Sequence, residues 1–158
     1  MGLRVGSGLD AHRFGGDGPV MLGTVEIPHD AGLVGHSDAD VVAHAVCDAL
    51  LAASGNPDIG ALFPPGDPEW EGAAGARLLG IVAERLAAQG CTVLNAHAVV
   101  VCERPRIGPH RHAMQRAMSA IVGAPVTVHA TTTERMGFTG REEGVFCQAT
   151  ALVETPSP

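Results

Sequence analysis

Apolar residues recur in this chain with two different spacings, and the two spacings alternate along the sequence. Between Asp38 and Ala53 they return every three or four positions, which is the repeat of an amphipathic helix. Between Gly144 and Glu154 they return every second position, which is the repeat of a strand with one buried face. The alternating set is Val145, Cys147, Ala149, Ala151 and Val153. Helices interleaved with strands indicate an α/β domain.

The same two patterns cover the rest of the chain. Strands are predicted at Leu3–Leu9, Val20–Ile27, Cys91–Cys102, Val126–Thr131 and Gly144–Glu154, and helices at Asp38–Ala53, Ala73–Gln89 and Pro109–Val122. Ser37 is the predicted N-cap of the first helix. The glycine-rich segment Gly15–Pro19 predicts a hairpin between the first two strands. We therefore predict one domain over residues 1–158, with a mixed β-sheet and about three helices layered on one side.

One segment is predicted to be irregular. Gly55–Gly72 contains four prolines among glycines and aspartates, which excludes long regular structure. A loop of this length in a compact domain is usually functional.

Composition narrows the classes of partner. The chain is 46% apolar but only 3% aromatic, so the core must consist of small aliphatic side chains in closely packed elements. A net charge of −7 with ten Lys and Arg argues against a nucleic-acid partner. The absence of a signal-like start or of eighteen consecutive apolar residues predicts no membrane segment and a cytoplasmic protein. The cysteines form no C-x-x-C pair and are interpreted as small buried thiols: Cys47, Cys91, Cys102 and Cys147.

Three residues form a candidate metal site. Asp10 and His12 follow a strand and lie two positions apart, so their side chains project to the same side. His44 lies on the first predicted helix between Asp40 and Asp48, and we interpret it as a ligand supported by the two carboxylates. One carboxylate and two imidazoles would give zinc three protein ligands and leave one position open, as in catalytic sites.

Four motifs, in order and in register, resemble the 2-C-methyl-D-erythritol 2,4-cyclodiphosphate synthase family across nearly the whole chain. They are G-S-G-L-D-A-H-R-F at Gly6–Phe14, G-H-S-D-A-D-V-V-A-H-A at Gly35–Ala45, D-I-G at Asp58–Gly60 and T-T-T-E-R-M-G-F-T-G-R at Thr131–Arg141. The family's zinc ligands fall on Asp10, His12 and His44, the set that the spacing also suggests. The resemblance implies that a CDP-linked substrate, 4-diphosphocytidyl-2-C-methyl-D-erythritol 2-phosphate, is cyclised with release of CMP. It also implies a homotrimer with active sites between subunits.

The resemblance implies roles for further residues. His36 and Thr132 would stabilise the transition state, and Glu134 would hold Mg²⁺ or Mn²⁺ together with the substrate phosphates. Taken without the family, a threonine run indicates only a strand, and His36 only an exposed turn. Arg141 and Glu143 would line the trimer axis, where an isoprenoid diphosphate is the implied ligand. The implied substrate-binding residues are Ser37, Asp58, Ile59, Gly60, Phe63, Asp67, Cys102, Pro105, Arg106, Ile107, Gly108, Thr131, Thr133, Phe138 and Arg141.

One segment departs from the family's pattern. After D-I-G most relatives read F-P-D-T-D-P, then a lysine, then A-D-S; the departing positions here are Pro65, Gly66, Glu71, Ala74 and Gly75. The resemblance assigns this segment to the part of the site that binds the methylerythritol. Because polar groups are lost there, we predict that the substrate or the catalytic efficiency differs from that of most relatives. The alternatives are a related cyclase for another CDP-alcohol phosphate, a zinc hydrolase, or a non-catalytic trimeric protein that binds isoprenoid diphosphates.

Overall fold

The computed structural model describes residues 1–156 as one α/β domain. The last two residues of the predicted domain lie outside the described residues. The strands are β1 (Gly2–Asp17), β2 (Val20–Leu22), β3 (Val25–Ile27), β4 (Ala31–Leu33), β5 (Thr92–Val101), β6 (Val126–Thr131) and β7 (Gly144–Thr155). The helices are α1 (Val41–Ser54), α2 (Ile59–Leu62), α3 (Gly75–Ala88), α4 (Arg111–Val122) and α5 (Gly137–Gly140), with 3-10 turns η1 (Pro68–Trp70) and η2 (Gly108–His110).

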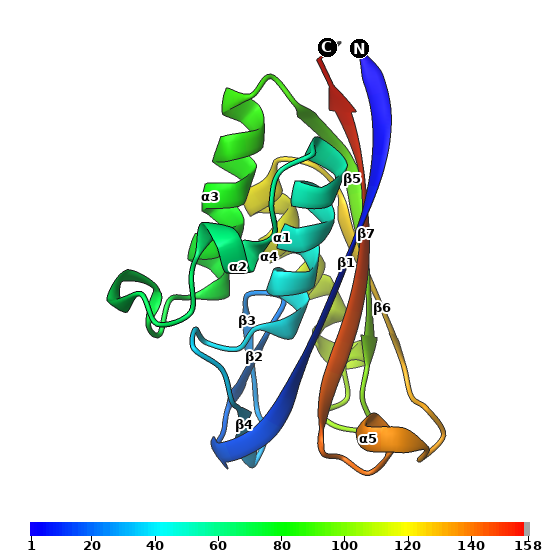
Figure 1. Ribbon diagram of the computed structural model, residues 1–158. Coiled ribbons are helices and arrows are strands. Elements are labelled where there is room, and N and C mark those ends of the chain that lie inside the picture. Colours follow the sequence, from blue (N-terminus) through cyan, green and yellow to red (C-terminus); the bar gives the residue numbers. More distant parts are fainter. Residues whose placement is uncertain (157–158) are drawn as a thin grey trace.

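Five strands form a mixed sheet in the order β4-β1-β7-β5-β6. β5 and β6 are parallel and are joined through α4, whereas β7 pairs antiparallel with both β1 and β5. The three long helices α1, α3 and α4 lie on one side of this sheet (Figure 1). The prediction of a mixed sheet with about three helices on one side is therefore confirmed.

The predicted hairpin between the first two strands is wrong. β1 continues through Gly15 and Gly16 to Asp17, and its long partner is β7, with Gly2 opposite Thr155 and Arg13 opposite Gly144. The segment after it folds back on itself instead, as the separate pair β2 and β3. Gly23 and Thr24 between them both have positive φ values, 59° and 65°, which suits a tight two-residue hairpin turn.

The buried layer between sheet and helices consists of small aliphatic side chains. The predicted face of β7 is buried throughout, from Val145 to Val153, and α1 is buried on nearly every side. Leu78, Leu79, Val82 and Leu86 of α3 cover α1. Cys47, Cys102 and Cys147 are buried free thiols, as interpreted from sequence, whereas the free thiol Cys91 is only partly buried. Within the described residues no helix combines the length and apolarity needed to span a membrane.

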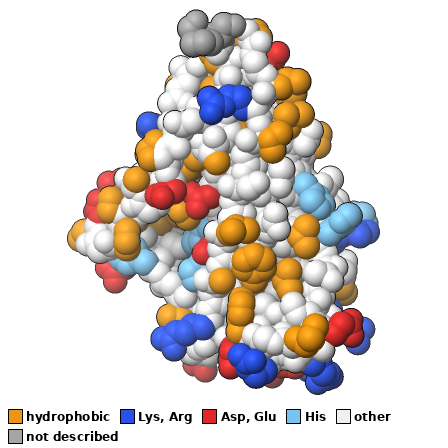
Figure 2. All heavy atoms as spheres, turned by 45° about the vertical axis from the view of Figure 1, so that its right-hand side comes forward, with side chains coloured by type: hydrophobic (Ala, Val, Ile, Leu, Met, Phe, Trp, Pro, Cys, Tyr) orange, Lys and Arg blue, Asp and Glu red, His pale blue; other side chains and the backbone are white. Residues whose placement is uncertain are grey.

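The opposite face of the sheet carries exposed apolar side chains. Leu3, Val5 and Leu9 of β1 are 66%, 67% and 60% exposed. Apolar side chains are visible along this side of the molecule in Figure 2. β1 thus presents an apolar row to solvent on one face and packs against α1 with the other.

Candidate functional site

The contact between β1 and α1 is unusually close, and it places the candidate metal ligands. A Cβ atom at Gly8 would overlap the carbonyl oxygen of Ala45, and one at Gly6 would overlap that of Ala49. Glycine at both positions therefore lets the helix backbone lie directly on the strand. Asp10 and His12 follow Gly8 by two and four residues, so they lie on the same face of β1 and meet His44 of α1.

The three predicted ligands converge. Asp10 Oδ2 lies 2.9 Å from His12 Nε2 and 3.1 Å from His44 Nδ1. One ligand atom from each of the three residues lies within 4.8 Å of the others. His44 is only 6% exposed, while Asp10 and His12 are partly exposed toward a cavity. The site is therefore enclosed on the protein side and open on one side only.

The hydrogen bonds of His12 prepare one ring nitrogen for a metal ion. Its Nδ1 lies 2.9 Å from the carbonyl oxygen of Val34, which can only accept, so this nitrogen carries the proton. The buried Nε2 has no hydrogen-bond partner with good geometry among the described residues. A buried lone pair beside a carboxylate and a second imidazole fits zinc, which takes nitrogen and oxygen ligands and uses three protein ligands in catalytic sites.

Two opposing effects set the protonation of this cluster. Burial alone would raise the pKa of Asp10, but the adjacent imidazoles of His12 and His44 outweigh it and lower the pKa of that carboxyl. Burial alone would lower the pKa of His12, but the Asp10 carboxylate outweighs it and raises that pKa. Asp10 is therefore ionised at neutral pH, as a metal ligand must be.

Among the described residues, neither carboxylate that flanks His44 on the helix is hydrogen-bonded to its ring, so the support predicted from sequence is not direct. Asp40, not Ser37, is the N-cap of α1, and it accepts hydrogen bonds from the backbone of Val42 and Ala43. Asp40 is fully buried and also accepts from Gly23 and Thr24 of the β2–β3 turn.

Asp48 serves the neighbouring loop. Its Oδ1 accepts a 2.8 Å hydrogen bond from the backbone of Ile59 at the start of α2. Burial and then the charge of Asp58 raise the pKa of the Asp48 carboxyl, against the hydrogen bond from Ile59. Asp48 and Asp58 both line a hollow of about 300 Å³, which Ser7 and Leu9 of β1 also line.

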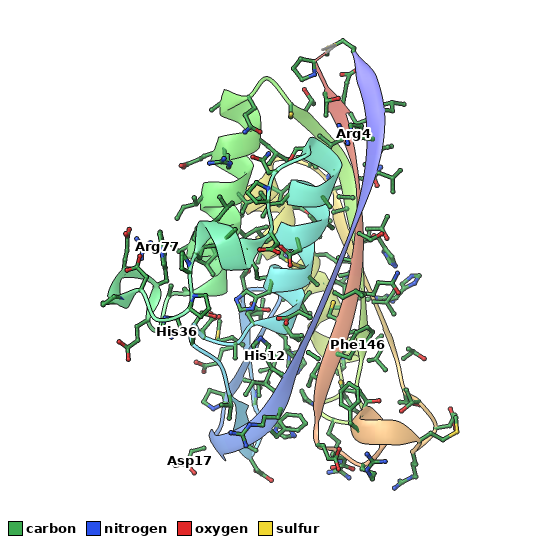
Figure 3. All side chains as sticks on the ribbon, in the orientation of Figure 1. Arg4, His12, Asp17, His36, Arg77 and Phe146 are labelled. Atoms are coloured by element: carbon green, nitrogen blue, oxygen red, sulfur yellow. The ribbon has the colours of Figure 1, made fainter. Side chains whose placement is uncertain are left out.

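A cavity of about 180 Å³ opens in front of the three ligands. Its lining residues are Asp10, His12, His36, Ser37, His44, Ile59, Gly60, Phe63, Pro65, Trp70 and Leu78. Phe63 and Trp70 meet edge to face with ring centroids 4.8 Å apart, and the Arg77 guanidinium lies 4.7 Å above the Trp70 ring. Figure 3 shows His12 on β1, with His36 and Arg77 beyond it on the side of the projecting loop, which is the proline-containing segment of residues 55–72.

The long proline-containing loop forms one wall of this cavity, as its length suggested. Asp58 caps α2 by accepting from Ala61, and Asp67 caps η1 by accepting from Glu69. His36 Nε2 lies 3.4 Å from both the Asp67 carbonyl oxygen and the Gly66 nitrogen. Of the predicted residues in this region, Asp58 and Asp67 do not line the metal cavity.

At two of the positions that depart from the family's pattern, the backbone or its packing favours glycine. Gly66 has φ +93°, a conformation that side-chain-bearing residues rarely adopt. Gly75 is buried, and a Cβ atom there would lie 2.9 Å from the Cβ of Asp40. A serine at position 75 would therefore require α1 and α3 to move apart slightly, and the expected loss of a substrate contact there stays a prediction.

The other predicted residues lie at the ends of β5 and β6. A cavity of about 520 Å³ is lined by Cys102, Glu103, Pro105, Arg106, Ile107, Gly108, Pro109, Ala130, Thr131 and Thr132. Arg106 is exposed there, whereas Cys102 and Ile107 are buried beneath it. Burial raises the pKa of the Cys102 thiol to about 12, so this cysteine is an inert packing residue.

The threonine run leaves β6 and enters an exposed turn. Thr132 Oγ1 lies 3.4 Å from the Glu134 carboxylate, and both side chains are exposed. Thr133 points inward instead, where its hydroxyl bonds to Met136 and Thr139. Its hydroxyl therefore already has two partners within the turn, and the substrate-binding role of Thr133 stays a prediction.

Glu134 and Arg135 both have positive φ values, 53° and 62°. The Glu103 carboxylate holds this turn by accepting a 3.0 Å hydrogen bond from the Arg135 nitrogen. Phe138 on α5 is 42% exposed, and Arg141 pairs with Glu143 at 3.1 Å at the surface.

The two cavities have no lining residue in common. The metal cavity lies between β1, α1 and the projecting loop, and α5 lies on the opposite side of β7 (Figure 1). Within one described chain the predicted residues thus form two separate groups. We name them after the roles predicted from sequence: the metal half-site (Asp10, His12, His36, Ser37 and His44) and the nucleotide half-site (Cys102–Gly108 with Thr131–Glu134, of which Thr131 and Thr132 line the cavity).

Some residues of the site had no signal in the sequence. Trp70 and Leu78 line the metal cavity, and the backbone of Val34 orients His12. Glu103 lies inside the predicted nucleotide segment, and its bond to the next turn follows no spacing in the sequence. A backbone carbonyl or an apolar side chain does not form a recognisable sequence motif, so only the fold could identify these residues.

Residues 3–154 of the chain match the YgbB family. The chain is 50% identical over 156 residues to the 2-C-methyl-D-erythritol 2,4-cyclodiphosphate synthase of Cereibacter sphaeroides, with 97% of this chain and 98% of that protein covered. It is also 50% identical over 157 residues to a bifunctional enzyme IspD/IspF of Caulobacter vibrioides. That alignment covers 98% of this chain but 41% of the bifunctional enzyme, so the chain spans about two fifths of such relatives.

The fold agrees with a solved relative as well. A 2C-methyl-D-erythritol-2,4-cyclodiphosphate synthase determined with bound CDP superposes with a TM-score of 0.87 at 34% identity. The superposition covers 96% of this chain and 100% of that structure. Sequence and fold thus give the same relationship over nearly the whole chain.

Proposed function

The chain belongs to the YgbB family, and from that premise we propose that it converts 4-diphosphocytidyl-2-C-methyl-D-erythritol 2-phosphate into 2-C-methyl-D-erythritol 2,4-cyclodiphosphate. An oxygen of the 2-phosphate forms a bond to the β-phosphorus, the bond from that phosphorus to the bridging oxygen breaks, and CMP leaves with the electron pair. The observation that carries this proposal is the convergence of Asp10, His12 and His44 at an open cavity.

The nucleophile and the leaving group both belong to the substrate, so the protein needs no catalytic serine or cysteine. Its residues have to fold the substrate until the attacking oxygen, the phosphorus and the leaving oxygen are in line, and to neutralise the phosphates. His36 and Ser37 at the cavity are suited to phosphate contact on the metal side. Phe63 and Trp70 form an apolar wall that excludes water from it.

Asp10, His12 and His44 would hold Zn²⁺. The free Nε2 of His12 and the enclosed position of His44 support this assignment. A bound zinc ion supplies Lewis-acid polarisation of a phosphate oxygen.

The nucleotide half-site would bind the CDP part. Backbone groups of Cys102–Gly108 and the exposed guanidinium of Arg106 are positioned around the larger cavity. Thr131 and Thr132 would contact the phosphates, and the exposed Glu134 carboxylate would share a Mg²⁺ or Mn²⁺ ion with them. An exposed carboxylate suits an ion whose remaining ligands come from substrate and water.

The separation of the half-sites supports a homotrimer. Because the metal cavity and the nucleotide cavity share no residue in one chain, a complete site would join the metal half of one subunit to the nucleotide half of the next. The exposed row of Leu3, Val5 and Leu9 would be covered by such contacts. Arg141 and Glu143 would then line the axis and could hold an isoprenoid diphosphate. A cytoplasmic location completes the proposal.

The decisive experiment is incubation of the purified chain with the CDP-linked substrate, Zn²⁺ and Mg²⁺, with phosphorus NMR of the products. The proposal requires CMP and a cyclic diphosphate. An acyclic product would identify a hydrolase instead. Turnover of another CDP-alcohol phosphate alone would mean that the substrate differs from that of relatives, and would point to the loop at Pro65 as the cause. Turnover of neither substrate would favour a binding protein.

A further inference from the structure

We propose that Ser37 is a positioning residue for the metal site: its hydroxyl holds His44 in the tautomer that a metal ion needs and turns its own proton toward the substrate. This inference rests on the proposed function for the nature of the ligand, but not for the metal-site geometry. Ser37 precedes α1 and lines the metal cavity, so its side chain can contact both His44 and a ligand in the cavity.

The first step follows from the two nitrogens of His44. Nδ1 lies 3.1 Å from Asp10 Oδ2, on the side where the three ligand atoms converge. Nε2 lies 3.0 Å from Ser37 Oγ. A metal ion at Nδ1 requires a lone pair there, so the single proton of the neutral ring must reside on Nε2. Ser37 Oγ must then accept that proton in a hydrogen bond.

The second step follows from the capacity of a hydroxyl, which has two acceptor positions and one donor. The backbone nitrogen of Ala39 donates to the same oxygen at 3.3 Å. With His44 as the other donor, both acceptor positions of Ser37 are used. Its O–H is then the one hydrogen-bonding group left to it, and because Ser37 lines the cavity this O–H can donate to a phosphate oxygen, which only accepts.

The two imidazoles are therefore oriented by different means. His12 is held by the backbone carbonyl of Val34, which no substitution removes. His44 is held by a side chain that also faces the ligand. Of the two imidazoles, removing the Ser37 hydroxyl should disturb only His44, although the Ala39 nitrogen also loses its acceptor. The usual effect of losing such a histidine partner is a 10- to 100-fold loss of metal affinity, in round terms about 30-fold.

The test uses Ser37→Ala and Ser37→Thr, with Ser54→Ala as a matched control. Ser54 lies at the far end of α1, where its hydroxyl bonds to the Leu50 and Leu51 carbonyl oxygens. Zinc dissociation constants are measured by competition with a chromophoric chelator, and Co²⁺ absorption spectra report ligand geometry. We expect about 30-fold weaker zinc binding for Ser37→Ala, and values within about threefold of wild type for the other two.

A second readout separates positioning from simple loss of a substrate contact. At saturating zinc, Ser37→Ala should still show a raised KM, because the donor to the phosphate is absent, whereas Ser37→Thr should restore it. Zinc affinity unchanged in Ser37→Ala, or lost equally in Ser37→Thr, would overturn the proposal. If wild-type protein forms no cyclic product, the proposed function fails, while the zinc titration still decides the role of Ser37.

Discussion

The metal half-site and the nucleotide half-site are built in opposite ways. Asp10, His12 and His44 project from a strand and a helix that are packed backbone to backbone, and they meet before any ligand arrives. Thr132 and Glu134 lie on an exposed turn after the end of β6. The fold thus preorganises the candidate metal ligands, whereas under the proposed function the nucleotide half-site would be completed by its ligand and a neighbouring subunit.

A carboxylate holds the backbone of each region, and the two carboxylates differ in burial. Asp40 is fully buried and accepts from four backbone nitrogens that join α1 to the β2–β3 turn. Glu103 is partly exposed and accepts from the single nitrogen of Arg135. Substitutions should therefore affect folding in the first region and ligand binding in the second.

The largest effect is expected in the metal half-site. His44→Ala should remove zinc and lower cyclisation by at least about a thousandfold, because two remaining protein ligands seldom retain a catalytic zinc. Metal analysis of the purified variant and product assays measure both. His112→Ala, an exposed histidine on α4, is the control. Full zinc occupancy in His44→Ala would remove this residue from the ligand set.

The two carboxylates provide the next test. Asp40→Ala should lower the free energy of unfolding by about 3–5 kcal/mol, because it leaves several buried N–H groups without an acceptor. Glu103→Ala, in the nucleotide half-site, should lower it by no more than about 1 kcal/mol. Urea unfolding at equal protein concentration measures both. Equal losses would contradict the contrast between the two regions.

Glu134→Gln tests the nucleotide half-site. Zinc should remain bound, while affinity for Mg²⁺ or Mn²⁺ should fall about 10- to 100-fold, because an amide is a poorer ligand for a hard cation. The measurement is a magnesium titration of activity beside zinc analysis. Glu84→Gln on the exposed side of α3 is the matched control. An unchanged titration would show that another group holds the second ion.

The loop beside the metal half-site should show a smaller effect. Pro65→Asp with Glu71→Lys should lower KM about two- to tenfold with little change in kcat, the size of one recovered hydrogen bond. Adding Gly66→Thr and Gly75→Ser should cancel the gain, because the first position has φ +93° and the second has no room for a side chain. Glu84→Lys controls for charge. A KM unaffected by the first pair would favour a different natural substrate.

The smallest effect concerns pH and the outer face of β5 and β6. Burial and then the charge of His129 lower the pKa of His97 below its usual 6.5. The folded state thus binds this proton less strongly than the unfolded state, so stability should fall as pH drops from the unfolded pKa to the folded one. The Tm of His97→Gln, measured by thermal unfolding, should fall less between pH 7.5 and pH 5 than the Tm of wild type. A parallel decline would exclude His97 as a source.

Local pattern was sufficient for much of the fold and for the metal ligands. The alternating face of β7 and the three long helices lie where their apolar spacing predicts them. Asp10 and His12 project together because they are two positions apart on a strand, which holds whatever the strand pairs with. These features depend on neighbours in sequence, and a sequence records such neighbours directly.

What the tertiary structure decided depends on partners far along the chain. β1 pairs with β7 rather than with β2, and Asp40 caps its helix and holds the β2–β3 turn rather than supporting His44. The hydrogen bond between Ser37 and His44 and the separation of the half-sites could not be predicted from spacing either. A side chain's hydrogen-bond partners are set by chain reversals and close backbone contacts, and these follow from the packing of the whole domain.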